Sequence, residues 1–173
     1  MPGLSEATEA LIGLGGNLGD PQSAFIHALE RLAAEESFEV TAVSSLWRTP
    51  PWGVADQPDY LNACVRGKTM LSAQSLLQRL LEAELAQGRV RKKRWGPRNI
   101  DLDLLFFGAH SIDEEGLVLP HPRLAERAFV LLPLAEIAPD WCYREDTIRS
   151  LAEAADPSGL EKIAAPGEWW RPG

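Results

Sequence analysis

A strand that begins with paired acids constrains this chain more than any other feature of its sequence. Residues 101–107 alternate and are rich in large apolar side chains, which predicts a half-buried strand. Side chains recur on one face of a strand at every second residue, so Asp101 and Asp103 point the same way, roughly 6–7 Å apart. The opposite face, against the core, is expected to carry Leu102, Leu104 and Phe106.

Two neighbouring carboxylates on such a strand repel each other and resist the loss of solvent. A bound divalent cation, or a pair of cations, would remove that penalty. Mg²⁺ suits the site, because it takes one or two carboxylates and completes its shell with water and phosphate oxygens. The sequence therefore predicts a magnesium site at Asp101 and Asp103.

The residues before this strand carry the opposite charge. The segment 89–98 contains six basic residues and no acid, within a chain of net charge −8. A basic loop that leads into paired acids suits a substrate that is both polyanionic and metal-bound, such as a nucleoside triphosphate. The alternative is a solvated basic loop followed by an edge strand with two outward-facing acids.

Composition limits the other possibilities. A length of 173 residues predicts one domain, with a core over about residues 10–155 and a tail, 156–173, that is left unassigned. The acidic balance argues against general nucleic-acid binding. The spacing of Cys64 and Cys142 fits neither a disulfide framework nor a zinc site. We find no signal peptide and no run apolar enough to cross a bilayer, so we expect a protein without a membrane partner, in the cytoplasm or, if a transit segment was removed, in an organelle lumen.

The order of elements predicts the fold. Apolar periodicity predicts four strands and two helices, in the order strand, helix, strand, strand, helix, strand: 10–14, 21–36, 38–47, 60–67, 72–88 and 101–107. This is the split β-α-β pattern of an α+β fold, a ferredoxin-like α/β/α sandwich with a mostly antiparallel sheet and helices on both sides.

The remaining elements are shorter. The glycine-rich loop after the first strand lacks both the G-x-G-x-x-G pattern and the Lys-Ser/Thr ending of a P-loop, so we interpret it as a turn before a helix capped by Asp20. Beyond residue 107 we predict a turn, a short strand, a helix bent at Pro133 and a last helix capped by Thr147: 108–116, 117–119, 123–136 and 147–155.

Two features suggest a place for a flat ligand. Pro50-Pro51 forms a stiff extended segment beside Trp52, which would suit a binding wall or a surface loop of no special role. Asn62 lies in the middle of a predicted strand, where its amide could pair with a heterocycle or satisfy a neighbouring backbone group.

Several segments, in order and with compatible spacing, together resemble one family. They are Thr49-Pro50-Pro51, Asp56 to Asn62, Gly88 to Arg91, Arg94 to Arg98, Asp101 to Asp103, Pro120 to Arg123, and Arg127 to Phe129. Over about residues 10–140 the chain is similar to 6-hydroxymethyl-7,8-dihydropterin pyrophosphokinases. These enzymes of folate biosynthesis transfer the terminal diphosphate of ATP to the hydroxymethyl group of a reduced pterin and release AMP.

The resemblance implies a role for particular residues. It gives a catalytic set of Arg89, Arg98, Asp101 and Asp103, of which the two acids hold two Mg²⁺ ions. It places the pterin against Thr49, Pro50, Pro51, Trp52, Tyr60, Asn62, Trp95 and Phe129. It places ATP, the co-substrate, against Glu84, Arg91, Arg94, Arg98, Leu104, His121 and Arg127. The basic loop would close over the phosphates, and no residue is marked as a general base.

Two other classes of function remain open at this level. A ferredoxin-like regulatory or RNA-binding module would explain the fold pattern and the basic loop, and it predicts exposed aromatic residues on strands. A structural interaction domain would use Trp169-Trp170 as a docking tail. The resemblance instead implies a monomer whose partners are small molecules.

Overall fold

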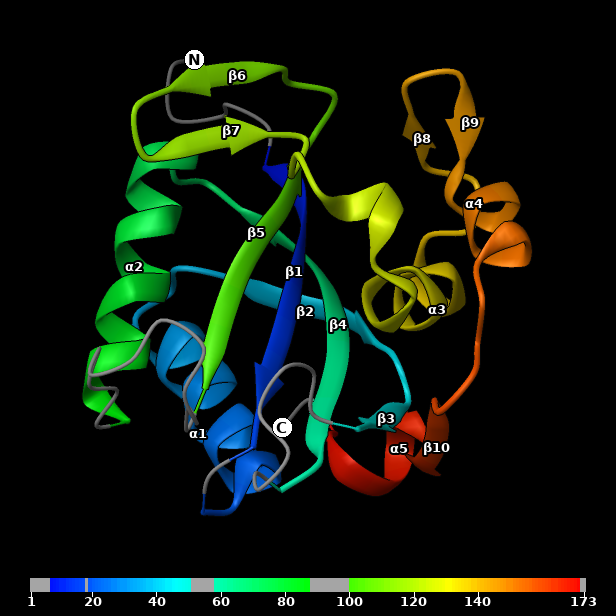
Figure 1. Ribbon diagram of the computed structural model, residues 1–173. Helices are drawn as coiled ribbons and strands as arrows, with labels where there is room; N and C mark the ends of the chain where they lie inside the picture. Colours follow the sequence, from blue (N-terminus) through cyan, green and yellow to red (C-terminus); the bar gives the residue numbers. More distant parts are fainter. Residues whose placement is uncertain (1–6, 18, 51–57, 88–99, 172–173) are drawn as a thin grey trace.

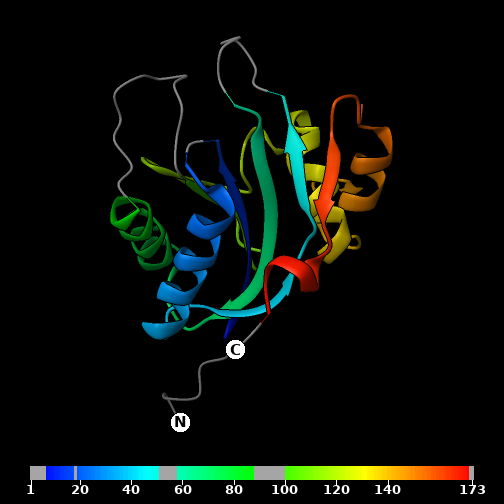
Figure 2. The same cartoon turned by 90° about the horizontal axis from the view of Figure 1, so that it is seen from below.

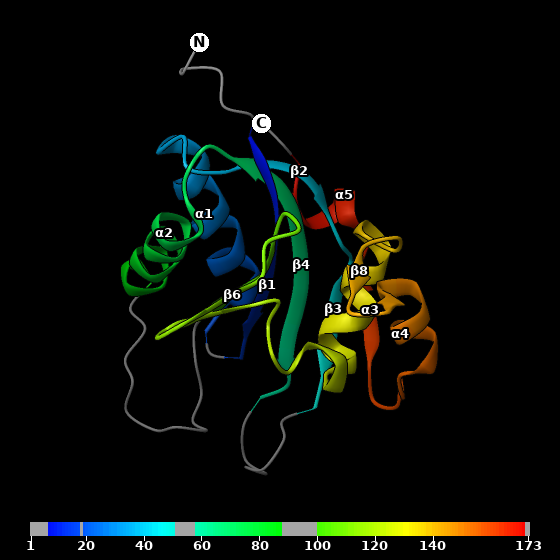
Figure 3. The ribbon, with the colours of Figure 1, turned by 90° about the horizontal axis from the view of Figure 1, so that it is seen from above.

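An antiparallel sheet separates two layers of helices in the computed structural model of the chain, which describes residues 7–17, 19–50, 58–87 and 100–171 (Figure 1). The strands follow the order β10-β3-β4-β1-β5, and β2 also pairs with β4. Views from opposite ends agree that α1 and α2 cover one face, while α3 and α4 cover the other (Figures 2 and 3). The predicted ferredoxin-like α/β/α sandwich is confirmed.

The sheet and the small hairpins contain ten strands in the part of the chain that the structure describes. Their bounds are β1 Thr8–Gly16, β2 Glu39–Val43, β3 Leu46–Thr49, β4 Tyr60–Thr69, β5 Asp101–Phe107, β6 Ile112–Glu114, β7 Leu117–Leu119, β8 Cys142–Tyr143, β9 Asp146–Thr147 and β10 Glu161–Ala164. The α-helices are α1 Pro21–Ala34, α2 Ala73–Ala86, α3 Ala128–Ile137, α4 Ile148–Ala154 and α5 Pro166–Trp169.

The two long helices begin at side-chain caps. The Asp20 carboxylate accepts a hydrogen bond from the Ser23 backbone N–H at 3.2 Å, and Pro21 occupies the first turn of α1. Ser72 Oγ accepts from the Ser75 N–H at 3.1 Å at the start of α2. These caps satisfy amide groups that have no partner within the helix. Both helices then bury their apolar faces in the larger core cluster.

A one-residue irregularity in β5 changes which face its apolar side chains cover. Ile12 pairs with Leu104, but Leu11 pairs with Phe106, so Leu105 is the extra residue of a bulge. The expectation for Phe106 was therefore wrong, because the bulge turns this ring into the second core cluster, under α3 and α4. Leu102 and Leu104 do lie in the core cluster under α1 and α2, as predicted.

The single strand predicted over 38–47 is two strands, because Ser44 and Ser45 interrupt it. Ser44 Oγ accepts a hydrogen bond from the Cys64 N–H at 2.8 Å, and Ser45 Oγ donates to Glu136 Oε1 at 2.7 Å. Side-chain hydroxyls thus compete with the regular ladder at this point. Both strands still pair with β4 on either side of the break.

The chain after β5 is more structured than predicted. The expected turn over 108–116 contains β6, which pairs with β7. The expected helix over 123–136 divides into a short 3-10 helix, Leu124–Glu126, and α3, and Pro133 lies inside α3. Thr147 caps α4 as predicted, with its hydroxyl accepting from the Ser150 N–H at 3.1 Å.

The unassigned tail belongs to the sheet and to the core. Strand β10 pairs with β3, and α5 places Trp169 in the larger core cluster with 3% of its surface exposed. The Trp169 indole N–H donates to the Ser44 carbonyl at 2.7 Å, and its ring meets Phe25 edge-on at 6.3 Å. A docking role for Trp169 is therefore wrong, because its surface is already covered by the fold.

None of the described helices is both long and apolar enough to span a membrane.

We predict that Gly67→Ala lowers the free energy of unfolding by about 3 kcal/mol, since overpacking against backbone leaves little room for relaxation. A Cβ at Gly67 would overlap the Glu39 carbonyl oxygen and the Phe38 ring, where β2 pairs with β4. The matched control is Gly13→Ala on β1, whose Cβ would meet Leu105 at an ordinary 3.5 Å. Urea unfolding measures both variants, and equal losses would contradict this account.

Candidate active site

The paired acids face an open stretch of the sheet because glycines stand beside them. Asp101 pairs with Gly15 on β1, and Gly15 pairs in turn with Asn62 on β4. Asp103 pairs with Gly13 in the same ladder. Cross-strand partners share a face, so these rows place the two half-buried carboxylates and the Asn62 amide on one surface with no side chain between them.

A crevice of ≈ 1230 Å³ opens over this surface and continues around the edge of β5 toward α2 and the β6–β7 hairpin. Ten of the residues that the sequence singled out line it: Thr49, Tyr60, Asn62, Glu84, Asp101, Asp103, Leu104, His121, Arg127 and Phe129. Residues from three strands (β3, β4 and β5), α2, the start of α3 and a loop thus meet in one place.

The other predicted site residues are placed differently. Pro50 is described and lies beside Gly159, but it is not one of the residues that line the crevice. Seven lie outside the described residues: Pro51, Trp52, Arg89, Arg91, Arg94, Trp95 and Arg98. Their roles stay predictions.

The amide at one end of the crevice is held in position. Asn62 Nδ2 donates to Thr49 Oγ1 at 3.0 Å, and both residues are buried. The Asn62 Oδ1 atom would lie 3.1 Å from a Cβ placed on Gly15, so the side chain lies across that glycine. The expectation that this strand amide needs a partner is confirmed, and the partner is a hydroxyl. A fixed amide can recognise a planar heterocycle with little loss of side-chain entropy.

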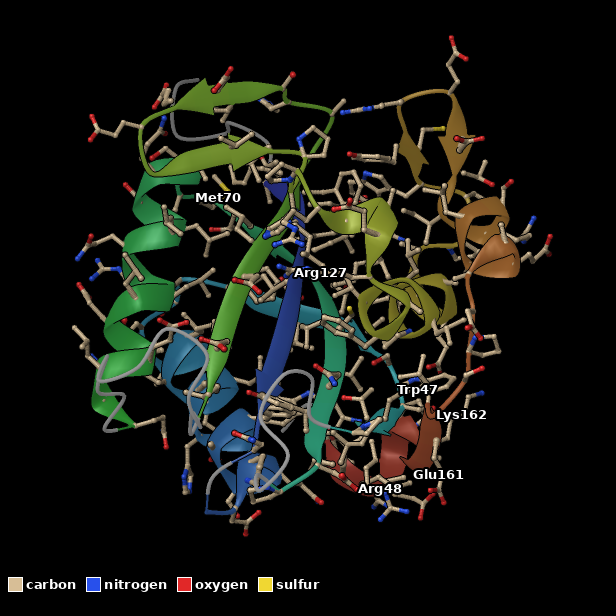
Figure 4. All side chains as sticks on the ribbon, viewed as in Figure 1. Trp47, Arg48, Met70, Arg127, Glu161 and Lys162 are labelled. Atoms are coloured by element: carbon tan, nitrogen blue, oxygen red, sulfur yellow. The ribbon has the colours of Figure 1, made fainter. Side chains whose placement is uncertain are left out.

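Aromatic and cationic side chains reach the crevice from opposite layers. Tyr60 comes from β4 and Phe129 from the first turn of α3. The Arg127 guanidinium lies 5.8 Å from the centre of the Phe129 ring and extends over the sheet (Figure 4). This arrangement places a cation over the Phe129 ring in a crevice that the two acids also line.

Glu84 fixes the strand that carries the acids. Its side chain is buried on α2, and Oε2 accepts a hydrogen bond from the Leu102 N–H at 2.7 Å. Leu102 stands between Asp101 and Asp103, so this contact holds the backbone that sets the spacing of both carboxylates. The resemblance suggested Glu84 as an ATP contact, and the structure gives it this positioning contact as well.

His121 lies beside the acids and is held by backbone contacts. The His121 backbone N–H donates to the Leu105 carbonyl at 3.0 Å, and the imidazole Nδ1 accepts from the Arg123 backbone N–H at 3.3 Å. Burial lowers the pKa of His121 below its ordinary value, Arg127 and Arg123 act in the same direction, and Asp103 opposes them. The imidazole is thus held neutral near Asp103 at neutral pH.

The donor set of the site fits magnesium. Within the described ranges, no group of three or more His, Cys, Asp or Glu side chains is arranged to hold a metal ion. Two carboxylates that line an open crevice leave most of a coordination shell to water and phosphate oxygens, which is the pattern that Mg²⁺ prefers.

Some residues of the site gave no signal in the sequence analysis. Gly13 and Gly15 matter because of the register of β1 with β5 and β4, which is a long-range property. Asp156, Ser158 and Leu160 line the crevice although the tail was left unassigned. Nothing local in the sequence indicated where this turn would lie.

The fold and the crevice define an α+β protein with a small-molecule site that combines an acid pair, a held amide and aromatic walls. Residues 11–139 match the family of 7,8-dihydro-6-hydroxymethylpterin-pyrophosphokinase (HPPK), and the chain belongs to this family. The pyrophosphokinase class and the setting in folate biosynthesis follow from that membership.

Similar proteins carry the name 2-amino-4-hydroxy-6-hydroxymethyldihydropteridine pyrophosphokinase. The protein from Methylorubrum extorquens is 48% identical over 90% of this chain and 99% of its own length. That from Synechocystis sp. is 43% identical over 90% of this chain and 80% of its own. The protein from Bacillus subtilis is 45% identical over 74% of this chain and 77% of its own length.

Solved structures agree on the fold. An HPPK-DHPS in complex with substrates gives a TM-score of 0.69 at 13% identity, over 87% of this chain and 43% of that one. A Plasmodium falciparum HPPK-DHPS triple mutant gives 0.68 at 16% identity, over 86% and 43%. This chain therefore spans less than half the length of those structures, and at such identity the likeness shows the fold alone.

We expect Glu84→Ala to lower the free energy of unfolding by about 2 kcal/mol, because it leaves the buried Leu102 N–H without this acceptor. Glu84→Gln, which keeps an acceptor oxygen, should lose less. Glu82→Ala on the same helix removes only a surface pair with Arg79 and should lose less than about 0.5 kcal/mol. Denaturant titration ranks the three variants, and a loss for Glu84→Ala no larger than for Glu82→Ala would contradict the assignment.

His121 predicts a dependence of stability on pH. Its folded-state pKa lies below the unfolded value, so the unfolded chain binds more protons and stability falls as pH drops below about 6.5. We expect His121→Gln to reduce the difference in unfolding free energy between about pH 7.5 and about pH 5.5. His27→Gln, on the exposed side of α1, serves as the control. An unchanged difference in His121→Gln would refute the effect.

Proposed function

We propose that this chain transfers the terminal diphosphate of ATP to the hydroxymethyl group of 6-hydroxymethyl-7,8-dihydropterin and releases AMP. The observation that carries this proposal is the crevice itself. The same space is lined by the acid pair, which suits a metal-bound polyphosphate, and by the Asn62 amide with its aromatic neighbours, which suit a flat heterocycle. The chain belongs to the HPPK family.

We assign the polyphosphate of ATP to the β5 end of the crevice. Asp101 and Asp103 would hold two Mg²⁺ ions, with His121 and Arg127 near the phosphates. Bound Mg²⁺ would neutralise the triphosphate and polarise the reacting oxygens. Glu84 and Leu104, at the outer edge of β5, lie where the nucleoside would follow from the phosphates.

The pterin half belongs to β4, β3 and α3. Tyr60 and Phe129 line the crevice from two layers and would stack on the faces of the bicyclic ring. Asn62 offers an amide that matches the amide edge of a pterin, and its bond to Thr49 keeps that edge aligned. We also assign to the pterin four residues that the resemblance places against it, Pro50, Pro51, Trp52 and Trp95.

The chemistry requires alignment more than covalent help. An alcohol attacks the β-phosphorus in line with the departing AMP oxygen, so the chain must bring a hydroxymethyl group and a charged triphosphate into one geometry. Planar guanidinium groups bind phosphate oxygens through paired hydrogen bonds. The proposal therefore assigns Arg89, Arg91, Arg94 and Arg98 to the phosphates, as a loop that closes when both substrates are bound.

The rival functions lack support from particular residues. An RNA-binding sheet would present exposed aromatic side chains, whereas the large apolar residues exposed in the described part of the chain are Met70, Leu85, Val118 and Ile163. We further propose that the chain acts as a monomer in the cytoplasm, with ATP and the pterin as its small-molecule partners.

We predict that Asp101→Asn and Asp103→Asn each lower the turnover number at least about 100-fold, because the metal-bound polyphosphate loses a ligand. The assay is AMP release from MgATP, with and without hydroxymethyl-dihydropterin. Unfolding free energy should remain close to that of the wild type.

The control for these variants is Asp146→Asn, an exposed acid in the β8–β9 hairpin, which should keep full turnover. Binding of Mn²⁺ in the presence of α,β-methylene-ATP, followed by electron paramagnetic resonance, should weaken in both site variants. Retained turnover in the acid-pair variants would contradict the metal assignment. Wild-type protein that releases no AMP in response to the pterin would contradict the proposed function.

A further inference from the structure

The C-terminal turn that follows α4 borders the crevice although it lies far from the site in sequence. Asp156, Ser158 and Leu160 line the same space as Thr49 and Asn62. The segment passes from the α4 layer down to β10 at the edge of the sheet (Figure 1). It therefore reaches the end of the crevice that holds the amide.

The turn lies beside Pro50, the residue that follows Thr49. Gly159 has φ +80°, a left-handed conformation that favours glycine, and a Cβ placed there would lie 3.3 Å from both Cγ and Cδ of Pro50. Pro50 precedes the undescribed part of its loop and follows Thr49, whose hydroxyl accepts from Asn62. The turn, Pro50, Thr49 and Asn62 thus lie next to one another in that order.

The turn is also fixed at its start. Asp156 Oδ1 accepts from the Ser158 N–H at 3.0 Å and from the Ser158 hydroxyl at 2.6 Å. The Leu160 N–H donates to the Pro157 carbonyl at 3.0 Å. These bonds define where Gly159 meets Pro50.

The end of the turn is fixed to the sheet and the core. Glu161 pairs with Arg48 in the β10–β3 ladder, and the Arg48 guanidinium contacts the Glu161 carboxylate at 2.5 Å and Asp59 at 3.9 Å (Figure 4). Lys162 lies over the Trp47 ring at 5.3 Å. Further along, Trp169 anchors the tail in the core. Arg48 precedes the proline-rich segment and Asp59 follows it, so the tail contacts the residue before this segment directly and the residue after it through Arg48.

We propose that the turn from Asp156 to Leu160 is a positioning element of the pterin site, which holds Pro50 and thereby the Thr49–Asn62 pair. This proposal rests on the proposed function. It assigns to the C-terminal tail a part in selecting the flat heterocyclic substrate and none in binding the nucleotide, because β10 pairs with β3 and Gly159 lies beside Pro50.

The main test is Gly159→Ala, which pushes Pro50 and strains the turn without changing a group that touches substrate. Steady-state AMP release should show a KM for the pterin raised about tenfold, because a small misplacement of a positioned group is costly. The KM for ATP and the turnover number should stay within about twofold of the wild type. Calorimetric titration of the pterin into enzyme with Mg²⁺ and α,β-methylene-ATP should show the same weakening.

The matched control is Gly19→Ala, which imposes a similar left-handed strain at φ +61° but has nothing within 4 Å of the added Cβ. It should leave both KM values unchanged. A second variant, Asp156→Ala, removes the bonds that shape the exposed turn without adding an atom, and it should raise the pterin KM less than Gly159→Ala does. It covers the case in which Gly159→Ala does not fold.

A double-mutant cycle tests the path through Pro50. In a Pro50→Ala background the ring atoms that the new Cβ would meet are gone, so Gly159→Ala should change the pterin KM by a smaller factor than in the wild type. Equal factors in both backgrounds would overturn the path.

The outcomes separate this proposal from the function on which it rests. A wild type without pterin-dependent AMP release overturns the function and this role with it. If the wild type is active, two results would overturn the positioning role alone. Either the KM for the pterin is unchanged in both turn variants, or the KM values for the pterin and for ATP rise together.

Discussion

The position of β5 against β1 is the constraint on which the site depends. It places two carboxylates opposite Gly13 and Gly15, so charge and open space occur together on one face of the sheet. Bringing two acids onto a half-buried surface is unfavourable unless something binds them or holds them apart. Glu84 fixes the backbone between them from α2, which makes the spacing a property of packing and not of the acids themselves.

The crevice exists because the sheet is covered unequally on its two faces. On one side α1 and α2 bury a continuous apolar cluster. On the other side α3 and α4 cover the part of the sheet around Leu11 and Leu105 and leave the ends of β5, β1 and β4 uncovered. The first turn of α3 then brings Phe129 and Arg127 to the border of this open surface, so the helix that completes the second core also supplies walls to the site.

The C-terminal tail shows how a segment outside the matched part of the chain can become part of the site. The family match ends at residue 139, yet β10 extends the sheet and Trp169 enters the core. A strand added at this edge lies beside β3, and β3 leads into the proline-rich loop. Sheet pairing therefore connects the end of the chain to the substrate-binding half of the crevice.

The sequence by itself determined the elements and the chemistry of the site. Periodicity and caps predicted the main helices and strands, and the alternation around Asp101 placed both acids on one face, because these properties depend on neighbours along the chain. The ordered motifs indicated the family. Only the tertiary structure decided the bulge that turns Phe106 to the other core, the break at Ser44 and Ser45, the bond from Glu84 to Leu102, and the place of the tail. Each of these depends on the register between distant strands or on contacts across layers, and such contacts leave no periodic trace in the local sequence.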